Sequence, residues 1–336
     1  MKTRQKHYQI HGKYPIVDQG QELIGGYTHD KERLCKAELP VIIFGDHTKK
    51  FKYIDFPFCL GADGTKVLRP KNGAHPKYLY YALQQAHIPE AGYSRHFKFL
   101  KQFQIPLPPL DEQKRIAAIL DKADELRRLR QRAIDRLNSL GQAIFYEMFG
   151  DPLEKGKHPE QPLGKCVRLI NGRAYRKHEE RERGTPVLRI QNLNGGDRWF
   201  YSDMKLPEEK YCEKGDLLFA WSATFGPYIW WGEKAIYHYH IWKIECGDSV
   251  EKNYMYWLLR VLADDVKRGG RGISMTHATK SGMEARLIPV PDIDKQKRFS
   301  EVTNLMQARL QNMEDHLQLL NINFDALQSN AFRGEL

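Results

Sequence analysis

The sequence predicts an α+β fold in which two mixed α/β modules are separated by two long antiparallel helices that form a coiled-coil spacer. Three observations predict this fold: a gapless internal repeat, an apolar stripe along each copy of the repeat, and short β-branched and aromatic runs elsewhere. We expect the first module at 1–109, the first helix at 110–150, the second module at 151–292 and the second helix at 293–336.

The first module contains β-branched and aromatic runs broken by glycine, which are typical of short strands. "VIIF" (41–44) predicts a buried strand and "KYLYYALQ" (77–84) a short aromatic helix. The second module repeats both, as "DLLFA" (216–220) and "NYMYWLLR" (253–260), at almost the same offset in sequence number. We therefore expect the two modules to share a mixed α/β fold.

The repeat starts at "QIPLPPLDEQKR" (104–115) and "LIPVPDIDKQKR" (287–298), and it continues without insertion or deletion to Phe149 and Phe332. Loops tolerate insertions and helices of fixed register do not, so the constant offset favours two long helices. Asp111 and Asp294 stand where acidic residues stabilise a helix N-terminus. Each helix of about 38 residues would be about 57 Å long.

Apolar residues recur at steps of three and four along both helices, which indicates a coiled-coil seam. The expected seam residues are Ile116, Ile119, Ala123, Leu126, Leu137, Leu140, Ile144, Met306, Leu310, Met313, Leu317, Leu320, Phe324 and Leu327. Because a whole module connects the two helices, we expect them to pack on each other antiparallel. The alternative is that each stripe docks on its own module as a core helix.

The two modules differ at their beginnings. The second opens with "PLGKCVRLINGRAY" (162–175), whereas the first begins at "KYPIVDQGQELIGGYTH" (13–29) and is the shorter of the two. Either the first strand of the first module has been lost, or residues 1–13 supply a divergent version of it.

The net charge of +11 is concentrated in the modules: +8 over 1–110 and +3 over 150–293, against +1 and −1 over 111–149 and 294–336. An excess in the modules would attract a polyanion such as a phosphate backbone. Mild basicity without functional meaning is the alternative. The five cysteines form no CxxC pair and no apolar run is long enough to span a membrane, so we expect a soluble protein of a reducing cytoplasm.

Base reading needs polar and basic side chains on exposed loops, and grip on the backbone needs Lys and Arg. The loops that meet both demands supply the candidate DNA contacts Lys49, Lys50, Arg95, His96, Lys98, Arg189, Gln191, Asn192, Ser222, Lys267, Arg268, Arg271, Ser274 and His277. For each of these residues, a merely solvated loop position is the alternative.

Signs of chemistry are lacking. His238 and His240 alternate on one strand, but no carboxylate or cysteine stands at the usual ligand spacing, which favours packing or exposure over a metal site. The sequence has no Asn-Pro-Pro-Tyr or Asp-Pro-Pro-Tyr run and no nuclease motif. We expect neither a catalytic nor a metal site.

Three stretches resemble the specificity subunits of Type I restriction-modification systems: "IPLPPLDEQKRIAAILDKADELRR" (105–128), "AIFYEMFGDP" (143–152) and "NAFRGEL" (330–336). The resemblance covers nearly the whole chain. It implies that each module is a target-recognition domain for one half of a split double-stranded DNA sequence, and that the two helices set the gap between the halves.

The same resemblance implies a non-catalytic subunit without a cofactor of its own. Its partners would be two methyltransferase (modification) subunits, which bind S-adenosylmethionine and methylate adenine, and endonuclease/translocase (restriction) subunits. Two alternatives from other classes are a DNA-modifying enzyme with an unrecognised active site and a coiled-coil protein-interaction adaptor. Steeply salt-dependent DNA binding would separate the first interpretation from an adaptor.

Overall fold

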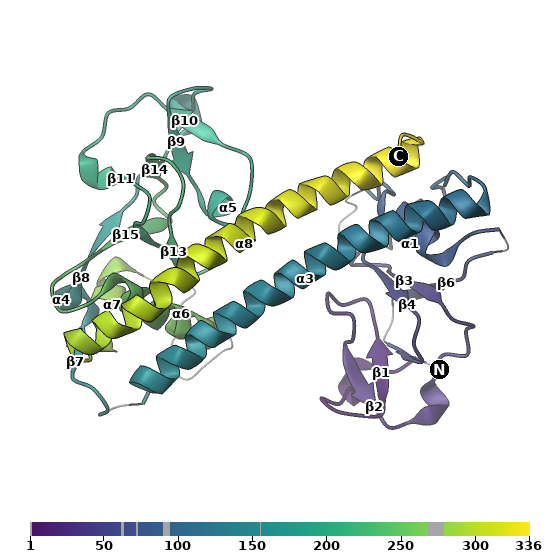
Figure 1. The fold of residues 1–336 in the computed structure, drawn as a ribbon, viewed down its shortest axis with the longest axis horizontal. Coiled ribbons are helices and arrows are strands. Elements are labelled where there is room, and N and C mark those ends of the chain that lie inside the picture. The colour runs from purple at the N-terminus through teal and green to yellow at the C-terminus, as the bar shows by residue number, and fades with distance from the viewer. Residues whose placement is uncertain (1, 62–63, 72, 90–94, 155, 268–278) are drawn as a thin grey trace. The chain divides into compact units, whose positions relative to one another are not determined.

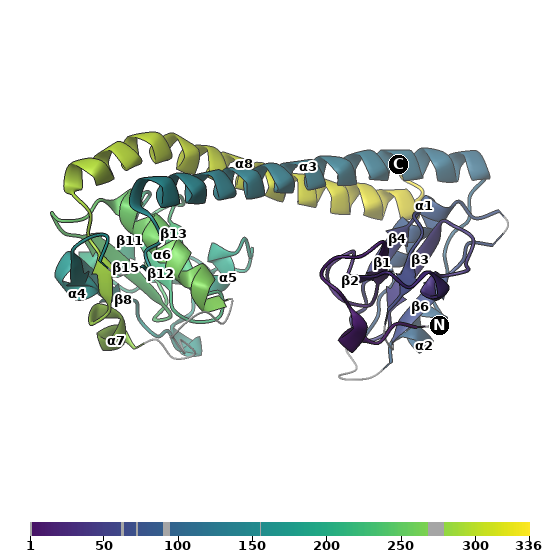
Figure 2. The same ribbon diagram turned by 90° about the horizontal axis from the view of Figure 1, so that it is seen from below.

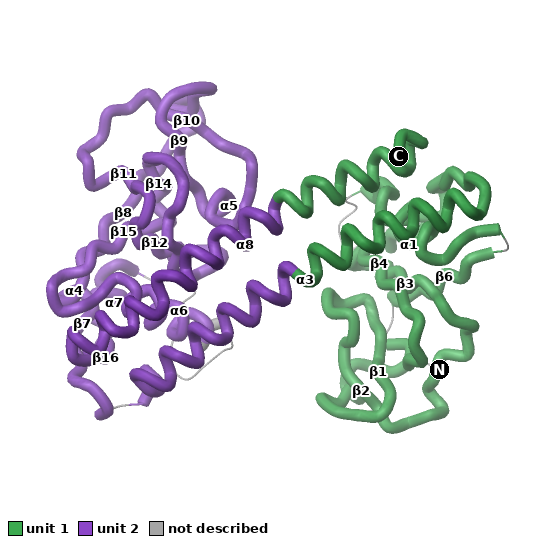
Figure 3. Tube along the Cα trace, viewed as in Figure 1, with its two compact units in different colours: residues 1–129, 319–336 green, residues 130–318 purple. Residues whose placement is uncertain are grey.

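The computed structural model describes residues 2–61, 64–71, 73–89, 95–154, 156–267 and 279–336. The chain divides into two compact units (Figure 3). Unit 1 comprises residues 1–129 and 319–336, and unit 2 comprises residues 130–318. Two long helices, α3 (Leu110–Phe149) and α8 (Ile293–Arg333), contribute to both units.

Unit 1 contains two three-stranded sheets, with the orders β2-β1-β5 and β4-β3-β6. In the first sheet, β1 pairs with β2 antiparallel and with β5 parallel; in the second, all pairing is antiparallel. The elements are β1 (Tyr14–Val17), β2 (Gly26–Thr28), β3 (Val41–Gly45), β4 (Phe51–Ile54), β5 (Cys59–Leu60), β6 (Thr65–Leu68), α1 (Pro76–Gln84) and α2 (Phe97–Leu100), with short 3-10 turns at Gln5–His7 and Lys31–Arg33.

Unit 2 contains the sheets β10-β9-β14-β11 and β13-β12-β15-β8 and the short pair β16-β7. Its strands are β7 (Glu160–Pro162), β8 (Val167–Asn171), β9 (Thr185–Leu188), β10 (Phe200–Ser202), β11 (Tyr211–Cys212), β12 (Leu217–Ala220), β13 (Gly226–Ile229), β14 (Ala235–Tyr237), β15 (Ile241–Cys246) and β16 (Leu287–Pro289). Its other helices are α4 (Leu163–Cys166), α5 (Ile190–Leu193), α6 (Lys252–Lys267) and α7 (Lys280–Glu284), with 3-10 turns at Lys177–Glu179 and Glu208–Lys210.

The two units repeat one topology. The order β4-β3-β6 in unit 1 corresponds to β13-β12-β15 in unit 2, and β2-β1-β5 corresponds to β10-β9-β14, including the parallel pair. The predicted strands at 41–44 and 216–220 are the central strands β3 and β12, whose apolar residues are buried on both faces. The predicted aromatic helices are α1 and α6. A shared mixed α/β fold is thus confirmed.

The N-terminal residues of unit 1 lie on a different sheet from the second module's opening strand. In unit 2 that strand is β8, which pairs with the outer edge of β15. In unit 1, residues 2–13 instead follow the β2-β1-β5 sheet, through a hydrogen bond from Thr3 N to Leu60 O (2.8 Å) and a bridge between Gln9 and Tyr27. Among the described residues of unit 1, no strand pairs with the corresponding edge of β6.

The two long helices run antiparallel in both units (Figures 1 and 2). In unit 1, Ile116 and Leu120 near the start of α3 share a buried cluster with Phe324 and Ala331 near the end of α8. In unit 2, Ile134 of α3 packs with Leu310 and Met313 of α8. The helices therefore bury apolar side chains against each other, as the seam predicts.

Each helix also docks on the modules, so both sequence interpretations hold at once. In unit 1, Tyr78 and Tyr81 of α1 belong to the same cluster as α3 and α8. In unit 2, Phe145 of α3 and Phe299 of α8 contact each other and join the core that contains Tyr254 of α6. The apolar stripe of each helix contacts both the other long helix and a module, which explains why it continues over 40 residues in α3 and 41 in α8.

The predicted seam of α8 is largely correct, because Leu310, Met313 and Phe324 are buried. Half-buried seam residues of the two helices are Ile119, Ala123, Leu137, Ile144, Met306, Leu317, Leu320 and Leu327. The assignment of Leu126 and Leu140 in α3 is wrong, since these side chains are 44% and 52% exposed.

The contact face of α3 lies one position further along than the apolar pattern suggested. It carries Asp124, Arg127 and Gly141, which an apolar seam does not include. The Asp124 carboxylate is paired with Arg127 and Arg128, and the Arg127 guanidinium stacks 3.6 Å from the ring centre of Phe324. Paired in this way, polar groups occupy the contact face without leaving a buried charge uncompensated.

Within the described part of the chain, no helix is long and apolar enough to cross a membrane. The long helices carry too many charges for that.

Candidate nucleic-acid interface

The basic loop of unit 1 begins at the tight turn between β3 and β4. Lys49 adopts a positive φ of 58°, and its N–H donates to Gly45 O (2.8 Å). The Lys49 ammonium donates to Ile88 O at 3.4 Å, whereas the Lys50 side chain is exposed. The turn therefore presents Lys50 to solvent and directs Lys49 partly back onto the unit.

Asp46 joins this turn to the second basic segment, 95–98. Asp46 is 1% exposed, its carbonyl accepts from His96 N (3.0 Å), and its carboxylate accepts from Phe97 N (2.7 Å). A further contact joins His96 Nδ1 to Asp46 O at 2.9 Å, and because a carbonyl only accepts, Nδ1 carries the proton. Two loops that are distant in sequence are thus held together by one buried aspartate.

The five predicted residues of unit 1 differ in their exposure to solvent. Lys50, Arg95 and Lys98 are exposed, and two predicted loops that sequence could not connect now form one basic surface. His96 is 2% exposed, so the prediction that it contacts DNA is wrong. Its ring fixes the 95–98 segment to Asp46, which makes it a positioning residue.

In unit 2, the segment around α5 is held by its own hydrogen bonds. The Asn192 carboxamide accepts from Arg189 N (3.0 Å) and donates to the carbonyls of Gly196 (3.2 Å) and Arg198 (3.0 Å). Asn192 is buried and its amide is fully used, so it shapes the loop and does not contact a ligand. Gln191 is exposed and donates to Arg198 O (2.8 Å).

The Arg189 side chain is oriented by two neighbours. Its Nη2 donates to Glu180 Oε1 at 2.9 Å, and its guanidinium lies 4.0 Å from the ring centre of Phe200. A guanidinium stacked and paired in this way is preorganised at the surface, with about a quarter of the side chain exposed.

The loop between β12 and β13 adjoins the α5 segment. Tyr228 Oη donates to Asn194 Oδ1 (3.1 Å) and lies 3.0 Å from Thr224 Oγ1. Ala223 has a positive φ of 56°, which turns the chain sharply between half-buried Ser222 and Thr224. The predicted residues Arg189, Gln191 and Ser222 therefore come from two loops that a polar cluster holds together.

Sequence reasoning missed the aromatic residues beside these loops. Trp221 stacks on Trp242 with ring centres 5.9 Å apart, and its Nε1 donates to Tyr239 O (2.8 Å). The ring centres of His238 and His240 lie 4.9 Å apart. Burial first, and then the neighbouring His240 and Arg189, lower the pKa of His238 to about 4. His238 is therefore neutral at physiological pH and offers one donor and one acceptor. In the sequence, the alternating His238 and His240 were the signal that could have indicated this cluster.

The remaining candidates of unit 2 lie at the end of α6 and in the segment after it. Lys267 is the last residue of this helix. The other four, Arg268, Arg271, Ser274 and His277, lie outside the described residues.

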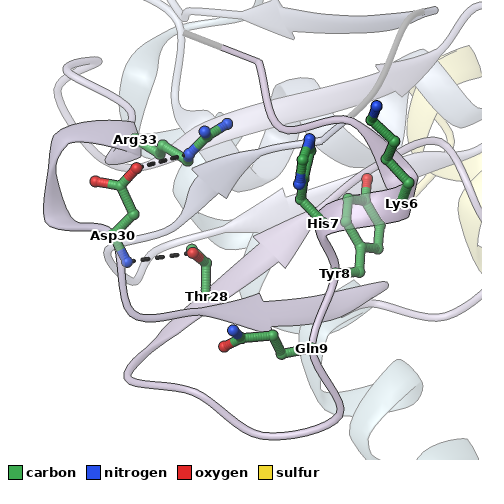
Figure 4. Close-up of a pocket in the computed structure, with 7 residues that line it drawn as sticks. All are labelled: Lys6, His7, Tyr8, Gln9, Thr28, Asp30 and Arg33. Atoms are coloured by element: carbon green, nitrogen blue, oxygen red, sulfur yellow. Dashed lines mark hydrogen bonds and ion pairs between the residues drawn. The ribbon is translucent and has the colours of Figure 1, made fainter.

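A further basic concavity lies at the N-terminal end of unit 1 (Figure 4). Its volume is about 390 Å³, and it is lined by Lys6, His7, Tyr8, Gln9, Thr28, Asp30 and Arg33. Arg33 Nε donates to Asp30 Oδ2 (2.7 Å), which fixes the guanidinium, and Lys6 and His7 line the same concavity. Such a group of donors suits a phosphate oxygen.

Two units with the same sheet orders share one pair of long helices, and exposed Lys50, Arg95 and Lys98 in unit 1 and preorganised Arg189 in unit 2 lie on their loops. Together these features are typical of a two-module recognition protein. The Type I restriction modification DNA specificity domain family matches residues 2–139 and 162–314, and the chain belongs to this family.

Individual relatives agree. The chain is 24% identical over 159 residues to the Type I restriction enzyme EcoBI specificity subunit of Escherichia coli, covering 46% of this chain and 34% of that one. It is 25% identical over 251 residues to the MjaVIII specificity subunit of Methanocaldococcus jannaschii, covering 65% and 59%. The matches thus span between a third and three fifths of these two relatives. A crystal structure of the Type I restriction-modification S subunit from M. genitalium, 17% identical, has the same fold, with a TM-score of 0.59 and coverage of 99% of this chain and 92% of that one.

Proposed function

We propose that this chain is the DNA-binding specificity subunit of a Type I restriction-modification complex and that it reads a bipartite target. The observation that carries this proposal is the duplication: two units with the same sheet orders, each built on the same antiparallel helix pair. Each unit would read one half-site, and the fixed lengths of α3 and α8 would set the gap between half-sites.

The exposed cations of unit 1 support a grip on DNA. Lys50, Arg95 and Lys98 extend from two loops that Asp46 holds together, so their spacing is fixed before binding. In unit 2, Arg189 is preorganised by Glu180 and Phe200. Preorganised donors lose little conformational entropy on binding. We therefore assign phosphate and base contacts to these loop surfaces.

We further propose that the chain scaffolds the methyltransferase and endonuclease/translocase subunits and has no catalytic role or cofactor of its own. In unit 1, Leu126 and Leu129 of α3 are exposed, and in unit 2, Leu305 of α8 is 79% exposed. Leu126 and Leu129 are three residues apart, as are Leu305 and Val302, which is 50% exposed, so exposed apolar side chains are grouped on one face of each helix. Grouped apolar side chains of this kind are typical of surfaces that other chains cover. S-adenosylmethionine would bind to the methyltransferase partners, which would carry out adenine methylation.

The test changes the helix length. The constant offset of the repeat makes Arg130 in α3 and Met313 in α8 equivalent positions near the middle of each helix. One helical turn inserted at both adds about 5.4 Å, which is between one and two base pairs at about 3.4 Å each. Methylated adenines would be mapped genome-wide after co-expression with the methyltransferase subunit.

We expect the wild type to yield a two-part motif, and the elongated chain to yield the same two half-sites at a longer gap. Altered half-sites at an unchanged gap would refute the spacer role. Wild-type binding with no salt dependence would favour an adaptor, and tight binding of S-adenosylmethionine by the isolated chain would favour an enzyme.

A further inference from the structure

One glutamine in the first turn of α3 ties together three segments of unit 1. The Gln113 carboxamide accepts from His75 N (2.8 Å), just before α1, and donates to Gly73 O (2.9 Å) and Pro108 O (2.8 Å). Its side chain is 1% exposed. The amide thus joins the start of α3 to the extended segment that enters it and to the loop that starts α1.

The glutamine at the matching position of α8 does the same in unit 2. The Gln296 carboxamide accepts from Glu251 N (2.9 Å), just before α6, and donates to Ser249 O (3.1 Å) and Pro291 O (2.8 Å). Its side chain is fully buried. Three bonds to the same kinds of backbone groups, in both copies, make this a built junction and not a chance contact.

A tyrosine reinforces each junction one turn into the short helix. Tyr78 Oη donates to Pro106 O at 2.7 Å in unit 1, and Tyr254 Oη donates to Pro289 O at 2.7 Å in unit 2. Each ring also packs on the far end of the opposite long helix: Tyr78 on Phe332 and Tyr254 on Phe149.

A further polar contact lies at equivalent positions in the two units, but the interacting groups differ. Lys77 pairs with Asp121 at 2.8 Å in unit 1, where Asn253 donates to Asn304 Oδ1 at 2.6 Å in unit 2. The glutamines and the tyrosines are therefore the parts of the junction that both copies share unchanged, while a neighbouring ion pair is replaced by an amide pair.

We propose that Gln113 and Gln296 are positioning residues that lock the orientation of each module on its long helix and thereby hold the complex to one gap length. This inference rests on the proposed function. A gap that is one base pair too long moves a half-site by about 3.4 Å and turns it by about 35°. A module fixed to its helix by three buried hydrogen bonds cannot follow this movement without breaking them, whereas a module without these bonds can.

The experiment measures gap tolerance in the full chain assembled with its methyltransferase subunits. The probes are DNA duplexes that carry both half-sites at the native gap and at gaps one base pair shorter and longer. Gln113→Met and Gln296→Met keep the length and volume of the side chain but remove all three hydrogen bonds. Gln131→Met is the matched control, because Gln131 is an exposed glutamine of α3 whose amide donates to the Asp135 carboxylate on the same helix.

The readout is the ratio of affinities for the native gap and the altered gaps. Loss of folded protein lowers all three affinities equally and leaves this ratio unchanged, so a merely structural role does not move it. We expect Gln113→Met and Gln296→Met each to lower the ratio about tenfold, the scale of one lost net hydrogen bond, and Gln131→Met to leave it at the wild-type value. Gln113→Asn, too short to reach both carbonyls, should give an intermediate ratio and carries the comparison if Gln113→Met does not fold.

Wild-type ratios in the folded glutamine variants would overturn the inference while leaving the proposed function standing. A wild-type complex that binds all gaps equally would overturn both, because no gap would then exist for the junction to enforce.

Discussion

Gly141 lies in the interior of α3, where a glycine normally weakens a helix, and its replacement by alanine is the sharpest test of how this helix packs. A Cβ at position 141 would lie 2.2 Å from Cη2 and 2.3 Å from Cζ2 of Trp257. Trp257 belongs to α6 and is fully buried in the core of unit 2. In unit 1 the equivalent positions carry Tyr81 and Phe324, whose ring centres lie 6.0 Å apart.

Two effects oppose each other in Gly141→Ala. Alanine is favoured over glycine in a helix interior by about 1 kcal/mol. Against this, contacts near 2.2 Å force the indole or the helix to move by about 1 Å in a packed core, and overpacking of this kind costs about 1 to 3 kcal/mol. The indole is enclosed on all sides, which places the cost near the upper end. We expect a net loss of about 1 to 2 kcal/mol in the unfolding free energy of unit 2.

The assay is urea unfolding of the full chain followed by tryptophan fluorescence, because all six tryptophans lie within unit 2. Ser139→Ala, an exposed position in the same helix, is the matched control and should change the midpoint little or raise it. Trp257→Tyr should relieve the clash, so the double variant with Gly141→Ala should be at least about 1 kcal/mol more stable than the two single changes predict. A Gly141→Ala midpoint at or above that of wild type would refute the packing argument.

Three further outcomes follow from single sites. The pKa of His238 is about 4 in the folded chain and near 6.5 when unfolded, so the stability that the neutral ring contributes is fully present above about pH 6.5 and is lost as pH falls towards 4. Solvent screening of this half-buried ring limits the loss of unfolding free energy to about 1 to 2 kcal/mol. His238→Gln should therefore flatten this part of the stability profile measured by urea unfolding. Lys50→Ala and Lys98→Ala should each lower the slope of log affinity against log salt by about 0.9 in DNA titrations, whereas Lys122→Ala on the exposed face of α3 should not. Leu305→Lys should leave the melting temperature and DNA affinity unchanged but weaken capture of the methyltransferase subunit in co-purification. Unchanged capture would show that Leu305 does not contact this subunit.

The long helices were predictable because their evidence is spread over many residues. A constant offset along the whole repeat and recurring apolar steps give α3 and α8 to within a few positions. The contact face of α3 was not predictable, because Asp124 and Arg127 lie in it only as partners of each other and of Phe324. A periodic apolar pattern does not describe a charged pair whose third partner lies on another helix.

The candidate interface shows the same limit on a smaller scale. Composition identified the basic loops, but it could not separate side chains that face solvent from those that build the loop. His96 and Asn192 are polar residues on loops, as a contact would be, yet each uses its hydrogen bonds on backbone groups that hold its loop in place. That distinction depends on Asp46 and Arg198, whose proximity exists only in the folded chain.

The differences between the two copies indicate what the repeat preserves. Unit 2 pairs Gly141 with Trp257 where unit 1 pairs Phe324 with Tyr81, so a small residue beside a large one replaces two rings of intermediate size. Residues that only fill space can differ in compensating pairs. Gln113 and Gln296 cannot, because no other side chain of that length offers one acceptor and two donors to three fixed backbone groups. The geometry of the junction, and not the identity of the core, is therefore what the repeat holds constant.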